Sequence, residues 1–237
     1  MIFTDVSYRY KGESDDALSG LNLTVEPGRA MALLGPNGSG KSTALGIGSG
    51  WLHVGSGRIE AQGSVAFLPQ SERLAFSFSC LEYVLFGRAP HLPYLAVPAG
   101  EDEEKAMASL GLVGMSDKAE RRITALSGGE LQLVRIARAL AQEAAYVLLD
   151  EPSEMLDPAH VATVGEAVRN LVNSGVGVLF STHDLAFALA CADDVAMLRS
   201  GRLLGVGPTA QTLSCEAMGV LYGTTFILRS LPTPLRG

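Results

Sequence analysis

Residues 35–43, Gly-Pro-Asn-Gly-Ser-Gly-Lys-Ser-Thr, match the phosphate-binding pattern G-x-x-x-x-G-K-[ST]. The three glycines let the backbone turn so that successive N–H groups face one anion. The apolar run Ala30–Leu34 directly before this loop predicts a buried strand. A helix that starts near Lys41 would present its free N–H groups and the positive end of its dipole to the same anion.

The side chains of this loop indicate which anion it binds. Lys41 brings a positive charge for the β and γ phosphates of a nucleotide, and the Ser42 hydroxyl is placed to ligate Mg²⁺. The alternative is a plain Gly/Ser turn, but strand, glycines, lysine and hydroxyl all fall in register. We therefore expect the chain to bind a nucleoside triphosphate with Mg²⁺. The expected contacts from the loop are Gly35, Asn37, Gly38, Ser39, Gly40, Lys41, Ser42 and Thr43.

Composition narrows the class of protein. The 237 residues, 47% of them hydrophobic, suffice to bury a full core. The net charge of −7 and the lack of a Lys/Arg cluster argue against nucleic acid as the main partner. Three scattered cysteines predict a reduced compartment. No apolar run reaches eighteen residues and no signal peptide is visible, so we expect any membrane part of the system to be another chain.

Strands and helices are expected to alternate along the chain, which predicts an α/β core. An antiparallel sheet is expected from the first 25 residues, and helical structure dominates from Leu81 to about Leu140. The other expected strands are 58–60, 64–68, 146–149 and 176–180, with a hairpin over 195–206. The other expected helices are 43–52, despite three glycines, 101–110, and a closing helix over 209–221.

Two carboxylates follow the apolar strand Tyr146–Leu149. Asp150, at the strand's carboxyl end beside the phosphate loop, is placed to hold Mg²⁺ through water. Glu151 next to it is a candidate general base that polarises the attacking water. The alternative is that both carboxylates are solvated acids at the end of a strand. The expected phosphate-binding loop beside them makes this alternative less attractive.

Ser127-Gly128-Gly129-Glu130 precedes an amphipathic helical pattern. Ser127 is a natural N-cap, and the two glycines leave the helix N-terminus bare for an anion. Alone, this stretch indicates only a capped helix.

Taken together, these motifs resemble the ATP-binding subunits of ABC transporters, over essentially the whole chain. Ser127-Gly128-Gly129-Glu130 resembles the signature of that family, and its separations from Lys41 and Asp150 suit the family. The resemblance gives roles to Gln70 as the Q-loop glutamine, Asp157 as the D-loop aspartate, His183 as the switch histidine, and Tyr10, or alternatively Tyr8, as the aromatic on adenine. It implies that Glu151, His183 and Gln70 are catalytic, that Ser127, Gly128, Gly129 and Asp157 join the ATP contacts, and that Ser42, Gln70 and Asp150 hold Mg²⁺.

The resemblance also implies an architecture and partners. The expected fold is a single P-loop NTPase domain over 1–237, with an N-terminal antiparallel β subdomain and an inserted helical subdomain at about 73–143. ATP is expected to join two copies, because the signature of one completes the site of the other. An integral membrane permease is expected to dock near 70–93, with an extracytoplasmic solute-binding protein acting indirectly. These partners place the chain at the cytoplasmic face of the cell membrane, as a peripheral subunit.

The imported solute is less constrained. Phe86–Leu92 and the tail Leu221–Gly223 resemble importers for iron chelates, haem or cobalamin, whereas Arg58–Gln70 resembles a molybdate-type relative. Importers of molybdate or of zinc and manganese are therefore alternatives. A soluble ABC ATPase without a transport role is another alternative, and a small-molecule kinase would not require Ser127–Gly129.

Glu154, which departs from the family pattern, and the segment 74–93 lead to further expectations. Glu154 stands where the family often has serine, so we expect its carboxylate to face the nucleotide of the partner subunit. In the segment 74–93, Arg88 is expected to be a charged docking anchor. The aromatic residues of that segment are either core or an exposed apolar patch for the permease, and they are Phe76, Phe78, Tyr83 and Phe86.

Overall fold

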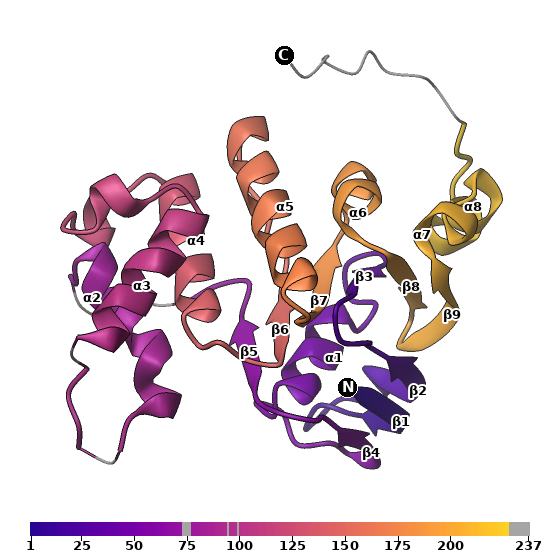
Figure 1. Ribbon diagram of the computed structural model, residues 1–237. Helices are drawn as coiled ribbons and strands as arrows, with labels where there is room; N and C mark the ends of the chain where they lie inside the picture. Colours follow the sequence, from indigo (N-terminus) through magenta and orange to yellow (C-terminus); the bar gives the residue numbers. More distant parts are fainter. Residues whose placement is uncertain (73–76, 94, 99, 228–237) are drawn as a thin grey trace.

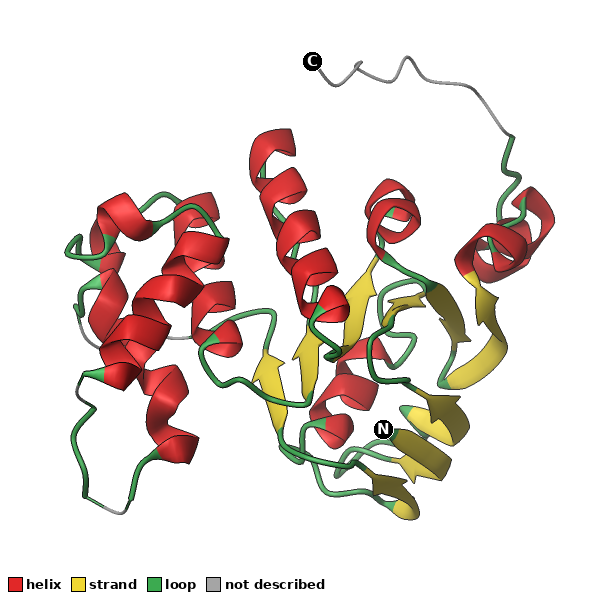
Figure 2. Ribbon diagram, viewed as in Figure 1, coloured by secondary structure: helices red, strands yellow, loops and turns green. Residues whose placement is uncertain are grey.

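The computed structural model describes residues 1–72, 77–93, 95–98 and 100–227. Two sheets and a group of helices make up this part of the chain (Figures 1 and 2). The order within the larger sheet is β5-β6-β7-β3-β8-β9. Its strands are β3 (Ala30–Leu34), β5 (Val65–Leu68), β6 (Tyr146–Leu149), β7 (Gly177–Thr182), β8 (Asp194–Arg199) and β9 (Arg202–Pro208).

The larger sheet is parallel from β5 to β8, and β9 adds an antiparallel edge as the expected hairpin partner of β8. The strands β3, β6 and β7 are buried throughout, as parallel strands covered on both faces must be. Alternate residues serve the two faces: Val147 and Leu149 belong to one hydrophobic cluster, Tyr146 and Leu148 to the other. Parallel strands end at the same edge, so the segments after β3, β6 and β7 meet there.

The N-terminal segment forms the expected antiparallel sheet, drawn at the lower right in Figure 1. Its order is β2-β1-β4, with β1 (Ile2–Tyr8), β2 (Leu18–Thr24) and β4 (Ser56–Glu60). Its inner side chains, such as Val6 and Leu21, are fully buried and share a cluster with Leu45 of the helix that follows the phosphate loop. The N-terminal sheet thereby packs against the helix that follows residues 35–40.

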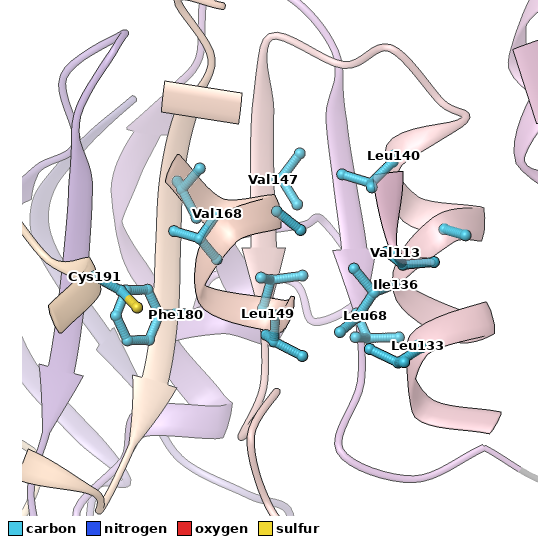
Figure 3. Packing of buried hydrophobic residues seen from close by; sticks show 14 of the residues in the cluster. Leu68, Val113, Leu133, Ile136, Leu140, Val147, Leu149, Val168, Phe180 and Cys191 are labelled. Atoms are coloured by element: carbon cyan, nitrogen blue, oxygen red, sulfur yellow. The ribbon is translucent and has the colours of Figure 1, made fainter. Parts of the chain in front are cut away.

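The helical part projects beside the β5 edge of the sheet (Figure 1). Its elements are α2 (Cys80–Leu85), η1 (Phe86–His91), α3 (Glu101–Leu112), η2 (Ser116–Lys118), η3 (Ile123–Ala125) and α4 (Gly128–Leu140). Leu133 and Ile136 of α4 lie against Leu68 of β5, as Figure 3 shows. These helices fall inside the expected range 73–143, of which residues 73–76, 94 and 99 lie outside the described residues. The subdomain boundaries therefore stay a prediction.

The remaining helices are α1 (Lys41–Gly48), α5 (Pro158–Asn173), α6 (Leu185–Cys191), α7 (Thr209–Thr212) and α8 (Cys215–Tyr222). The expected helix 43–52 begins two residues earlier and ends at Gly48, because the backbone turns to a φ of 79° at Gly50. A Cβ on Gly48 would lie 2.9 Å from the Phe3 ring and 3.0 Å from Leu148, so close packing explains this glycine. None of the described helices is long and apolar enough to cross a membrane.

The single closing helix expected over 209–221 is wrong. The chain leaves the helical region at Leu213, with φ −84° and ψ 66°, and a new helix starts after Ser214. The Ser214 hydroxyl accepts a hydrogen bond from the Ala217 N–H at 3.1 Å. Ser214 is thus the N-cap of α8, a separate helix that contacts β8.

Candidate functional site

A cavity of about 710 Å³ opens where β3, β6 and β7 end. The phosphate-binding loop, residues 35–43, forms one wall. Side chains from distant parts of the sequence form the others, and the principal ones are Tyr10, Gln70, Glu151, Glu154, His183 and Tyr222. The crevice beyond the carboxyl ends of the strands is the usual ligand site of such sheets.

The loop has the backbone that an anion site needs. Gly40 has a φ of 104°, and a Cβ there would lie 2.5 Å from the carbonyl oxygen of Ala17. Helix α1 begins after Gly40 without any side-chain cap, so its first N–H groups stay open to a ligand. The buried Ser39 hydroxyl has no hydrogen-bond partner among the described residues. Open N–H groups and an unsatisfied buried hydroxyl fit a phosphate chain.

Lys41 is buried, with 6% of its side chain exposed. Its Nζ donates hydrogen bonds to the carbonyl oxygens of Gly35, at 2.8 Å, and Pro36, at 3.3 Å. The Oε1 atom of Glu151 lies 3.8 Å away, at the outer limit of an ion pair. Because two carbonyls and one distant carboxylate leave much of this charge uncompensated, the ammonium favours an anion in the cavity.

The acidic pair after β6 is organised by Ser181 of β7. The Ser181 hydroxyl donates to Oδ1 of Asp150 at 2.5 Å and accepts from the backbone N–H of Glu151 at 2.8 Å. Glu151 has a φ of 49°, a strained value for a residue with a side chain. Its Oε2 atom lies 3.0 Å from Nδ1 of His183. The structure thus brings the expected general base and the expected switch histidine together in the cavity.

The two tyrosines proposed for adenine differ in position. Tyr10 lines the cavity, is 42% exposed, and its hydroxyl lies 3.1 Å from Oγ1 of Thr43. Tyr8 supports it from the side, with the two rings edge to face at a centroid distance of 5.0 Å. Of the pair, Tyr10 is therefore the one available for stacking on a base.

The residues expected to hold Mg²⁺ do not all reach the cavity. Ser42 and Gln70 line it, whereas Asp150 is buried at 4% exposure behind Glu151 and does not. Within the described ranges, no three His, Cys, Asp or Glu side chains are grouped as a metal site. A hydroxyl, an amide oxygen and a carboxylate acting through water nevertheless suit Mg²⁺, which keeps several waters and phosphate oxygens among its ligands. The donor set therefore fits the ion.

The signature residues lie apart from this cavity. Ser127 caps α4 through a capping box with Glu130, whose carboxylate accepts from the Ser127 N–H at 2.7 Å. That hydrogen bond and the Lys118 ammonium lower the pKa of Glu130 to about 2. Neither Gly128 nor Gly129 lines the cavity. The tip of α4 thus presents open N–H groups away from the nucleotide loop of its own chain.

Asp157 is likewise outside the cavity and caps α5. Its Oδ1 accepts from the N–H groups of Ala159 and His160, both at 3.0 Å, and its Oδ2 lies 2.7 Å from the His160 ring. The bond from the His160 N–H lowers the pKa of Asp157. A Cβ on Gly129 would lie 3.0 Å from that ring and 3.5 Å from Leu156, so the start of α4 packs closely against the start of α5.

Two residues of the site were not singled out from the sequence. Tyr222, the last residue of α8, lines the cavity with a buried hydroxyl that lacks a hydrogen bond of good geometry among the described residues. Burial raises the pKa of this phenol, and the Glu151 carboxylate adds to the rise. The only signal for it was the resemblance of Leu221–Gly223 to a group of importers.

Arg135 of α4 is the other missed residue. It is 7% exposed and donates to the carbonyl oxygens of Pro69 at 2.6 Å and Gln70 at 3.3 Å. It also donates to Oε1 of Gln132 at 2.7 Å. An arginine within an amphipathic helix is usually solvated, so nothing in the sequence pointed to this contact.

The segment 77–93 only partly matches the expected docking surface. Tyr83 is core at 2% exposure, Phe78 is half-buried, and Phe86 is 49% exposed, while Phe76 lies outside the described residues. The prediction of Arg88 as a surface anchor is wrong. Its side chain is 3% exposed, because its guanidinium is used inside the helical part, where it bonds Asp102, Glu143 and the Ala141 carbonyl.

Comparison with known proteins shows what this chain is similar to. The model of the ABC transporter family matches residues 18–154. The chain is 35% identical to the hemin import ATP-binding protein HmuV of Pseudomonas entomophila, over 96% of this chain and 94% of the relative. A solved structure of an inward-facing metal-chelate type ABC transporter superposes with a TM-score of 0.88 at 31% identity, covering 98% of this chain and 92% of that one. The dimeric structure of the ABC transporter cassette MJ0796 superposes with a TM-score of 0.79 at 25% identity, covering 88% and 98%.

Proposed function

Because the chain belongs to the ABC transporter family of ATP-binding proteins, we propose that it hydrolyses ATP to power import of haem or a related metal chelate through a separate membrane permease. The observation that carries the chemistry is the convergence of Lys41, Glu151 and His183 on one cavity beside the phosphate loop. The match to a hemin import protein over nearly the whole chain favours a metal chelate above molybdate or zinc. It also disfavours a soluble ATPase without a transport role.

Binding follows from the loop and the aromatic residue. The open N–H groups of α1 and the Lys41 ammonium hold the phosphates, while Tyr10 supports the base. Ser42, Gln70 and, through water, Asp150 are the residues that would hold Mg²⁺, which would supply charge neutralisation at the phosphates.

Hydrolysis requires a positioned water. The Glu151 carboxylate accepts one proton of that water at Oε1 or Oε2, which makes its oxygen a better nucleophile. His183, whose Nδ1 lies 3.0 Å from Oε2, orients this carboxylate and lines the same cavity. The strained backbone of Glu151 aims its side chain into the cavity while Asp150 stays buried.

The exposed signature supports a composite site in an ATP-bound homodimer. Ser127 and Gly128 are exposed and lie outside the cavity of their own chain, so a second copy is the natural user of these N–H groups. Met155, on the loop that leads to Asp157, is 96% exposed, so it offers a further apolar side chain for contact with a second copy. ATP would hold the two copies together, and hydrolysis would release them.

The permease is assigned to the surface near residues 70–93, at the cytoplasmic face of the membrane. Gln70 lines the nucleotide cavity, and the exposed Phe86 offers aromatic contact area on the helical side. A solute-binding protein would contact the permease and act on this chain only through it.

Reconstitution tests both halves of the proposal. The chain, co-purified with its permease in proteoliposomes, should hydrolyse ATP and take up haem or another iron chelate, and Lys41→Ala should abolish both activities. Absence of ATP hydrolysis by the wild-type complex would refute the proposed ATPase activity. Uptake of molybdate or zinc in place of a chelate would be consistent with the proposed ATPase activity but would contradict the proposed class of solute.

A further inference from the structure

Gln70 is held at both its backbone and its side chain. Arg135 of the signature helix donates to the carbonyl oxygens of Pro69 and Gln70, at 2.6 and 3.3 Å. At the other end, Nε2 of Gln70 donates to Oε2 of Glu154 at 2.7 Å. Glu154, expected to face a partner's nucleotide, thus lies in the cavity of its own chain.

The chemistry of this pair fixes which way the amide points. An ionised carboxylate only accepts hydrogen bonds, so the Gln70 amide must turn its NH₂ group toward Glu154. Its Oε1 atom is then the group left for a ligand, and no described side chain donates to it. The bond involves a charged acceptor and is short, which makes it stronger than a neutral pair.

The turn that carries Glu154 is built to hold it there. Its backbone N–H donates to the carbonyl oxygen of Glu151 at 3.1 Å. The residues on either side of this turn, Glu151 and Met155, have φ values of 49° and 59°. The reversal at Met155 sends that side chain to 96% exposure while Glu154 lines the cavity. Such strained backbone persists only where the surrounding structure requires it.

We propose that Glu154 is a positioning residue that orients the Gln70 amide, so that Oε1 faces the divalent cation of the bound nucleotide. This inference rests on the proposed function, because it assumes that the cavity takes a metal–nucleotide complex. Acceptors behind a metal ligand commonly fix its orientation, and their loss costs about 10–100-fold in metal affinity. A serine at this position is too short to reach the amide in the same way.

Metal binding without turnover tests the role. Mn²⁺ serves as the probe, with the chain in excess over a non-hydrolysable ATP analogue so that all of the analogue is protein-bound, and free Mn²⁺ is measured by electron paramagnetic resonance. Glu154→Ala should weaken Mn²⁺ binding by about tenfold. Glu154→Gln should retain most of the affinity, since its amide oxygen still accepts from Gln70. In a Gln70→Ala background, Glu154→Ala should have no further effect, because the two act as one unit.

Three outcomes would overturn the inference. Unchanged Mn²⁺ affinity in Glu154→Ala would remove any role, and tighter binding would mean that Glu154 withholds Gln70 from the metal. An equal loss in the Gln70→Ala background would assign the effect to the charge of Glu154 acting through space. Thermal unfolding without nucleotide checks that each variant is folded. Failure of the wild-type chain to bind the metal–analogue complex would instead refute the proposed function.

Discussion

Nδ1 of His183 lies 3.0 Å from Oε2 of Glu151, across the gap between the ends of β7 and β6. Ser181 ties the same two strands by donating to Asp150 and accepting from the Glu151 N–H. The proposed general base, Glu151, and its neighbours are therefore positioned by two adjacent buried strands, and the close-packed core opposes small shifts between these strands.

Glu151→Gln should keep ATP affinity while lowering turnover by about 10²–10⁴-fold, the range typical of a lost general base. An ATP-bound dimer should accumulate, since hydrolysis no longer releases the two copies. Nucleotide binding, steady-state hydrolysis and light scattering measure the three effects. Near-normal hydrolysis would remove Glu151 from the role.

Tyr222→Phe tests the contribution of α8 to the cavity. The buried hydroxyl lacks a well-formed hydrogen bond within the described chain, so its removal should leave the nucleotide-free melting temperature unchanged or slightly higher. ATP should bind severalfold more weakly if the phenol donates to the bound nucleotide. Thermal unfolding with and without ATP separates the effects. A loss of stability without nucleotide would make the hydroxyl structural.

Glu130 should link stability to pH. Its pKa is lowered from 4.5 to about 2 by the Ser127 N–H and Lys118, so its stabilising contribution is complete above pH 4.5 and disappears as the pH falls toward 2. The capping box suggests about 1 kcal/mol, reduced by solvent screening.

The matched variant is Glu130→Gln, which keeps an acceptor for the Ser127 N–H but does not titrate. Between pH 4.5 and 2 the wild-type free energy of unfolding should fall more steeply than that of the variant, as followed by urea unfolding monitored by circular dichroism. Parallel curves would contradict the assignment.

Substitutions of Phe86 and Tyr83 should distinguish a contact with the permease from a contact within the core. Phe86→Ala should reduce co-purification with the permease and lower the melting temperature much less than Tyr83→Ala, because Phe86 is 49% exposed and contacts Phe78 and Tyr83 only edge to face. Tyr83→Ala should destabilise the chain by about 3–5 kcal/mol, because Tyr83 is core. Full retention of the permease by Phe86→Ala would move the docking surface elsewhere.

Local patterns in the sequence were sufficient for the parts of the site that follow a buried strand. Lys41, Glu151 and His183 each follow an apolar run, and parallel strands necessarily bring their ends to one edge. The spacing of strands and turns also indicated the N-terminal sheet and the hairpin of β8 and β9.

The features that could not be predicted from the sequence depend on tertiary contacts. Arg88 and Arg135 are ordinary surface types, and only the fold shows that carbonyls and carboxylates surround them. The break at Leu213 has no glycine or proline to announce it. Glu154 was expected to face the partner's nucleotide from the family resemblance alone, and the reversal of the chain at Met155, with φ 59°, has no signature in residue type.

The hydrogen bonds from Arg135 to the carbonyl oxygens of Pro69 and Gln70 would couple the two ATP sites of the proposed dimer. Helix α4 is a continuous rod of 13 residues, roughly 20 Å long, that starts at the signature. One end would sense the nucleotide of the partner, while Arg135 grips the loop that serves the chain's own nucleotide. ATP bound at one of the two sites would then change the position of the Gln70 loop at the other site. The hydrolysis rate should therefore rise sigmoidally with ATP concentration, with a Hill coefficient approaching about two.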